Sequence, residues 1–215
     1  MRQIGIPTTT WLTNIAATAA GLLLLLFVGR MPRSTRLRTQ VTIALAAIAT
    51  ILLAFVSNGM LGVHRWVSLG GFHLQPSAIV APLIIACITA IAPSRAASAF
   101  AIAALTTIIL ALQPDAAQTT SFAAACSVIV AFDIQTSRPQ KAIGITILLA
   151  AAAISFTQLD PLAPVQHVEE IYGLVASKGA AWAAVGATAL LLLPLPFVVV
   201  FLQTREPVTL ALAVY

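Results

Sequence analysis

Charged side chains are scarce in this sequence. Of its 215 residues only 8% are Asp, Glu, Lys or Arg, and 60% are hydrophobic, whereas a soluble domain carries about 25% charged residues. So few charges cannot cover the surface of a water-soluble fold. The composition therefore excludes most soluble proteins and predicts an integral membrane protein.

Residues that bind metals or form disulfides are also few. The chain has two Cys and three His residues, and both Cys87 and Cys126 lie in apolar runs with no CxxC or Cys/His cluster. No disulfide framework, metal site or cofactor is therefore predicted. The formal net charge of +5 comes from basic residues in short gaps between apolar runs. That pattern orients membrane proteins, so no nucleic-acid partner is expected.

The apolar runs predict about seven transmembrane helices, since a span takes about 20 apolar residues. We expect an all-α, polytopic bundle that forms one integral membrane domain over residues 1–215. The runs lie near residues 12–29, 39–57, 77–92, 97–112, 117–133, 141–157 and 171–202. Pro194 and Pro196 should bend or end the last and longest run. Small residues such as Gly144 and Gly186 are typical of helix contacts in lipid.

The Lys and Arg residues are distributed unevenly between alternate loops. One set of loops holds Arg30, Arg33, Arg36, Arg38, Arg95, Arg138, Lys141 and Arg205, and the other holds Arg2, Arg65 and Lys178. The positive-inside rule places the first set in the cytoplasm. The N-terminus should then be outside and the C-terminus cytoplasmic. Asp133, at the inner end of its span, should form a surface ion pair with Arg138 or Lys141.

This orientation puts three polar segments on the outer face. The first reads GVHRWVSLGGFHLQPS over residues 62–77 and contains Arg65 and Trp66, with Pro76 well placed for a first helical turn. The second reads LQPDAAQTTS over residues 112–121, and its Asp115 can cap the following helix. An interface-anchoring loop and a helix cap explain these features without any chemistry.

The third segment, LDPLAPVQHVEEIYG over residues 159–173, groups His167, Glu169 and Glu170. Two carboxylates beside an imidazole suit acid–base work. A solvated helix start near a positive dipole end explains Glu170 equally well.

Together and in order, these segments resemble the SEDS family of cell-wall polymerases, the FtsW and RodA proteins. That family has an RW motif followed by QPSE, then QPDLGT, then an acidic motif after a histidine. The matching residues here are Gly62, Arg65, Trp66, Gly70, Gln75, Pro76 and Ser77, then Gln113, Pro114 and Asp115, then His167 with Glu169 in place of the family's aspartate. The matches are collinear and all lie on the predicted outer face.

The resemblance implies transfer of a lipid-linked disaccharide onto a glycan strand at the outer face of the bacterial inner membrane. It implies Glu169 as the base with His167 beside it. Arg65, Trp66, Gln75, Asp115 and Glu170 would line the substrate site, where Arg65 would hold a phosphate or shape the cavity. A penicillin-binding transpeptidase, other integral membrane proteins and membrane lipids are the implied partners.

The sequence also departs from the family pattern. The motif that reads QPSE in the family ends in Ala78 here, and a nearby lysine of the family is replaced by Ala81. The long outer loop that precedes the acidic motif in the family is also much shorter. The match covers the second to eighth of the family's ten helices. These departures favour a non-catalytic accessory or scaffold subunit of a larger inner-membrane complex. A reduced peptidoglycan glycosyltransferase is the alternative, and a carrier that binds lipid without chemistry is a third hypothesis.

Overall fold

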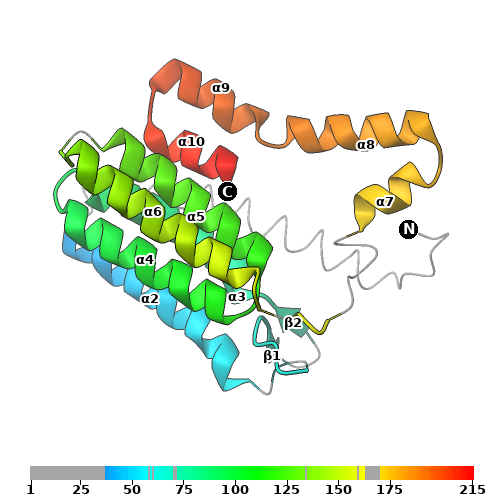
Figure 1. The fold of residues 1–215 in the computed structure, drawn as a ribbon, viewed down its shortest axis with the longest axis horizontal. Coiled ribbons are helices and arrows are strands. Elements are labelled where there is room, and N and C mark those ends of the chain that lie inside the picture. Colours follow the sequence, from blue (N-terminus) through cyan, green and yellow to red (C-terminus); the bar gives the residue numbers. More distant parts are fainter. Residues whose placement is uncertain are drawn as a thin grey trace. The chain divides into compact units, whose positions relative to one another are not determined.

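The fold is seen in a computed structural model, which describes residues 37–57, 59, 61–69, 72–133, 135–158, 160–162 and 170–215. The predicted span at 12–29 lies outside the described residues. The helices are α2 (Leu37–Val56), α3 (Pro76–Ile91), α4 (Ala96–Leu112), α5 (Ala116–Phe132), α6 (Arg138–Ser155), α7 (Ile171–Ala176), α8 (Ala180–Leu192), α9 (Leu195–Thr204) and α10 (Pro207–Val214). The chain is therefore mostly helical in its described part (Figure 1).

Helices α2 to α6 form a bundle, and each begins within three residues of a predicted apolar run. Local signals fix several of these starts. Pro76 occupies the first turn of α3, where its missing N–H costs nothing. Asp115 caps α5 by accepting a hydrogen bond from the Gln118 amide. Ser137 and Gln140 form a capping box at the start of α6.

A small β-hairpin interrupts the helical architecture between α2 and α3. Strands β1 (Val67–Leu69) and β2 (Phe72–Leu74) pair antiparallel, with Val67 opposite Leu74. The expectation of a purely helical fold therefore needs this correction. Alternating residues such as Val67, Ser68 and Leu69 are too few to stand out in a sequence dominated by long apolar runs.

The predicted run at 171–202 is not one element in the structure. It is divided into α7, α8 and α9, and α10 follows it without having been predicted. Gly179 separates α7 from α8 with a φ of 115°, a conformation that favours glycine. The second break, between α8 and α9, falls at Pro194, where a proline interrupts the helical hydrogen bonds.

The bundle core is built mainly from Ala and Ile side chains, with a few larger ones. Ala44 and Ile51 of α2, Ile84 of α3, Phe122 of α5 and Leu148 of α6 are all fully buried in it. Gly144 of α6 lies so close to α4 that a Cβ there would meet the Phe100 ring at 3.3 Å. The small residues of this bundle therefore permit close helix contact, as expected in lipid.

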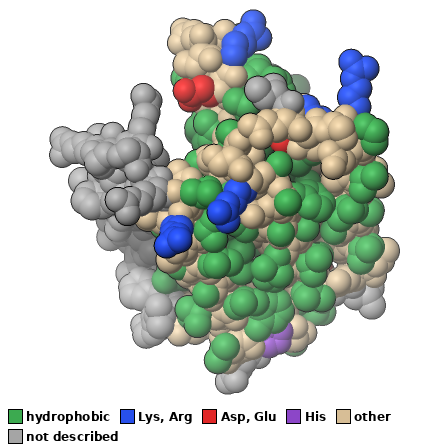
Figure 2. Space-filling model, turned by 90° about the vertical axis from the view of Figure 1, so that its left-hand side faces the viewer, with side chains coloured by type: hydrophobic (Ala, Val, Ile, Leu, Met, Phe, Trp, Pro, Cys, Tyr) green, Lys and Arg blue, Asp and Glu red, His purple; other side chains and the backbone are tan. Residues whose placement is uncertain are grey.

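Many large apolar side chains point outward. On α2 and α6, Leu53 and Ile143 are more than half exposed, and Leu191 is 77% exposed on α8. Figure 2 shows one face that is largely hydrophobic, with Lys and Arg side chains among the apolar ones. Exposed apolar surface on this scale marks contact with lipid or protein.

Two helical stretches in the described part have the length and hydropathy to cross a membrane. They are Leu37–Val56 and Ala180–Thr204. Helices α3, α4 and α5 are also apolar but have 16 or 17 residues, which corresponds to about 24–26 Å of helix. These lengths lie near the lower limit for a span.

The turns of the bundle alternate between two ends (Figure 1). The turns at 92–95 and 133–137 lie at the end where α2 begins. The hairpin strands, the turn at 113–115 and residues 160–162, which follow α6, lie at the opposite end. Residues of all three polar segments therefore meet at one end of the bundle, away from the basic turns.

Candidate functional site

Arg65 is the centre of a polar cluster at the hairpin end of the bundle. Its guanidinium is enclosed by acceptors from its own chain, and the residue is only 7% exposed. Nε donates to the Gln113 carbonyl at 3.3 Å, and Nη2 donates to the Pro114 carbonyl and to Asp160 Oδ2, the latter at 2.6 Å. Asp115 Oδ2 lies 3.7 Å from Nε. One side chain thus joins all three outer segments.

Asp115 connects the second outer segment to the first. Its Oδ1 accepts from the Gln118 amide as the α5 cap, and its Oδ2 accepts from Gln75 Nε2 at 3.0 Å. The residue is 8% exposed, so its charge depends on these donors and on Arg65. The structure therefore brings together Arg65, Gln75 and Asp115, which are widely separated in the sequence.

Gln113 extends the cluster into the bundle. It is buried, and its Nε2 donates to the Ile51 carbonyl of α2 at 3.3 Å. Its Oε1, like the buried Ser77 hydroxyl at the start of α3, has no hydrogen-bond partner among the described residues. Buried polar atoms of this kind are normally satisfied, so these two are the atoms of the cluster with capacity for a water or a ligand.

Trp66 lies beside Arg65 with a structural role of its own. The Arg65 guanidinium carbon is 5.9 Å from the Trp66 ring centre, within cation–π range. The Trp66 carbonyl accepts from the Ser57 hydroxyl at 2.8 Å, which ties the loop to the end of α2.

The acidic motif is only partly visible. His167 and Glu169 lie outside the described residues, so their predicted place beside Arg65 stays a prediction. Glu170 is exposed at the start of α7, and its carbonyl accepts from the Leu174 amide. Its predicted role in substrate binding also stays a prediction.

Asp160 was not predicted as a site residue from the sequence, yet its carboxylate lies closer to Arg65 than that of Asp115 does. Its side chain is 38% exposed, whereas that of Arg65 is 9% exposed. The sequence did contain a signal for this ion pair, because a buried arginine needs a carboxylate partner and the chain has only six acidic residues. Every acid of the outer segments was therefore a candidate.

The cluster can hold three loops in register, and its cation is already engaged. Two carbonyls and two carboxylates contact Nε and Nη2 of Arg65, so a phosphate would have to displace one of them to reach these nitrogens. Within the described residues, no group of three or more His, Cys, Asp or Glu side chains is placed to hold a metal ion.

An apolar helical bundle with outward-facing hydrophobic side chains and a polar cluster at one end defines a helical membrane protein. Comparison with known families makes the assignment specific. The family model described as cell cycle protein of the FtsW, RodA and SpoVE group matches residues 1–170. The chain belongs to this family, the SEDS family. No curated protein and no solved structure matches it significantly.

Proposed function

We propose that this chain is a multi-pass protein of the bacterial inner membrane that serves as a non-catalytic accessory or scaffold subunit of a larger complex in cell-wall synthesis or division. The observation that carries the proposal is the enclosure of Arg65 by four acceptors of its own chain. In this arrangement the residue fastens the outer loops together, and its Nε and Nη2 are already occupied by acceptors, which disfavours a pyrophosphate there.

The start of α3 supports the same conclusion. Where the family pattern has the glutamate of QPSE, this chain has Ala78, which is exposed and uncharged. Ala81 stands at the position of the family lysine and is fully buried in the helix packing. Positioning groups supply about 7–11 kcal/mol of a catalysed barrier when they are well oriented. Retaining one carboxylate at Glu169 does not replace them.

The alternative is a reduced peptidoglycan glycosyltransferase that uses lipid-linked disaccharide. Two buried polar atoms of the cluster that have no partner among the described residues, the Ser77 hydroxyl and Gln113 Oε1, favour it, because a substrate can supply their missing partners. In that reading Glu169 is the base and His167 assists it.

Two measurements separate these functions. Purified protein given lipid-linked disaccharide and a divalent cation should form no glycan, and Glu169→Gln should leave its cellular role nearly intact. Glycan product that disappears with Glu169→Gln would establish the enzyme instead. Purification of the native protein in mild detergent should bring down a stoichiometric membrane partner. A penicillin-binding transpeptidase in that complex would support a role in cell-wall synthesis.

A further inference from the structure

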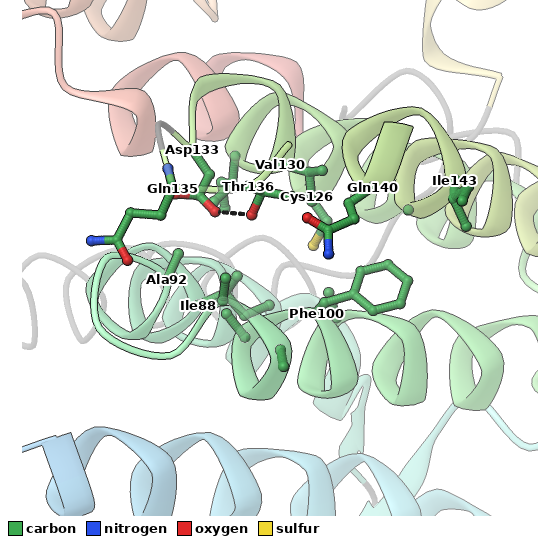
Figure 3. A pocket seen from close by; sticks show the side chains of 16 residues that line it. Ile88, Ala92, Phe100, Cys126, Val130, Asp133, Gln135, Thr136, Gln140 and Ile143 are labelled. Carbon is green, nitrogen blue, oxygen red and sulfur yellow. Dashed lines mark hydrogen bonds between the residues drawn. The ribbon is translucent and has the colours of Figure 1, made fainter. Parts of the chain in front are cut away.

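A second feature lies at the opposite end of the bundle from Arg65. A cavity of about 480 Å³ opens between α3, α4, α5 and α6, next to the turns at 92–95 and 133–137 (Figure 3). Its volume is within the range of about 300–1,000 Å³ found for small-molecule sites. None of the candidate site residues lines it.

The inner walls of this cavity are apolar. Ala96, Ala99 and Ala103 of α4 line one side, and Cys126 of α5 lines another. These small side chains leave the space that larger residues would fill. Ala96 and Ala103 are seven residues apart, so the cavity extends about 10 Å along the helix axis. An elongated apolar group fits such a space better than a compact polar one.

The rim of the cavity is polar, and two exposed arginines lie next to its lining residues in the sequence. Arg95 stands between the lining residues Ala92 and Ala96 and is exposed, and Arg138 is exposed in the turn that supplies Thr136 to the rim. Asp133 is the acidic residue of this rim. Its carboxylate accepts from the Gln135 amide at 3.1 Å and from the Thr136 hydroxyl, which is the dashed bond in Figure 3.

These bonds differ from the expected ion pair of Asp133. The carboxylate is used to hold its own turn, and Lys141 Nζ donates to the Ala131 carbonyl at 2.8 Å instead. No ion pair among the described residues joins Asp133 to Arg95 or Arg138. Two exposed cations therefore flank a mouth that holds one carboxylate, which favours an anion there, while the interior suits hydrocarbon.

We propose that this cavity binds an acyl chain of an anionic phospholipid, with the lipid phosphate held at the rim by Arg95 and Arg138. Basic pockets between membrane helices bind anionic headgroups, and here a polar rim flanked by two exposed arginines continues directly into an apolar space. The proposal concerns a different end of the molecule from the Arg65 cluster and does not depend on the scaffold function.

The test uses the full chain in phosphatidylcholine nanodiscs that contain a trace of photoreactive lipid. The probe is phosphatidylglycerol with a diazirine in its acyl chain, and phosphatidylcholine with the same chain is its control. After illumination, crosslinked peptides are mapped by mass spectrometry. Crosslinks of the anionic probe should concentrate in residues 96–103 and 126–130 and exceed those of the neutral probe there.

Variants test the two parts of the site separately. Each of Arg95→Gln and Arg138→Gln should reduce crosslinking of the anionic probe about fivefold, since a cation near an anionic headgroup has an effect of that order. Arg38→Gln removes an exposed cation from α2, which does not line the cavity, and should change nothing. Ala99→Leu narrows the apolar space and should reduce crosslinking of both probes.

Two results would overturn the proposal. One is equal crosslinking of the anionic and neutral probes at the cavity, which would show that the two flanking arginines do not select an anionic lipid. The other is crosslinking confined to helices outside the cavity, such as α8 and α9. Because the arginine variants alter exposed side chains, they keep the test decisive even where Ala99→Leu does not fold.

Discussion

Replacement of Arg65 by methionine tests how much of the outer face depends on one side chain. Methionine keeps an unbranched apolar stem and removes the guanidinium. Asp115 would then be a carboxylate with 8% exposure and no cation, and the Gln113 and Pro114 carbonyls would lose their donor. Breaking a buried ion pair by removing one partner costs about 3–5 kcal/mol, and we expect Arg65→Met to destabilise the protein by that amount.

Most of this cost arises from Asp115 and not from Asp160. The Asp160 side chain is 38% exposed, and a pair that is open to solvent contributes about 0.2–1 kcal/mol. Arg65→Lys should recover only part of the loss. A lysine keeps the charge, but its single ammonium group cannot reproduce the planar fork that serves several acceptors at once.

The measurement is the free energy of unfolding in mixed micelles, obtained by titration with a denaturing detergent and followed by circular dichroism. Arg38→Met is the matched control, because Arg38 is exposed on the first turn of α2, and a surface change of this kind stays within about 0.5 kcal/mol. Arg65→Met combined with Asp115→Asn should cost less than the sum of the single changes. Strict additivity, or an Arg65→Met protein as stable as Arg38→Met, would refute the reasoning.

Two further predictions follow from named contacts, and a third follows from the distribution of Lys and Arg between the loops. Asp160→Asn should lower the unfolding free energy by no more than about 1 kcal/mol in the same titration. A loss as large as that of Arg65→Met would contradict the conclusion that Asp115 contributes more than Asp160. Gly144→Leu should destabilise by about 1–3 kcal/mol through overpacking against Phe100, whereas Gly173→Leu, whose Cβ meets nothing within 4 Å, should be neutral. A reporter active only in the cytoplasm should score positive when fused after Tyr215 and negative at the N-terminus, and the reverse pattern would invert the predicted topology.

The bundle from α2 to α6 was predictable because each helix is one apolar run bounded by a recognisable start or stop. Pro76 and Asp115 mark two of these starts by mechanisms that act within one turn. The C-terminal part was harder, since α10 has eight residues and falls below the length that a span requires. Its position depends on packing against α5 and α9, which a hydropathy pattern does not encode.

The cluster around Arg65 was predictable only through its motifs. Nothing in local periodicity places Gln75 beside Asp115, which are 40 residues apart. The family pattern grouped them, and the contacts now explain that grouping physically. Asp160 has no counterpart in the motifs that were matched, so its ion pair with Arg65 could not be anticipated in the same way.

The two glycines that suggested helix contacts pack against neighbouring helices of their own chain. Gly144 faces Phe100 of α4, and Gly186 of α8 faces Val175 and Tyr172 of α7. Both contacts are within the chain. Substitution at these glycines therefore reports on the packing of this protein, and a partner surface has to be sought on exposed side chains such as Leu191.

Arg65 also determines what the enzyme alternative requires. A pyrophosphate can reach Nε or Nη2 of this guanidinium only by displacing an acceptor. Of the two carboxylates, Asp160 is the one that can be exchanged, because its side chain is exposed enough to be rehydrated, whereas Asp115 is buried and caps α5. The enzyme would thus open by releasing residues 160–162 from Arg65, and Asp160→Asn would ease that release and strengthen phosphate binding. A scaffold has no use for such an opening, so the same substitution would change only its stability. The Arg65–Asp160 ion pair is in this way the contact at which the enzyme and the scaffold would differ.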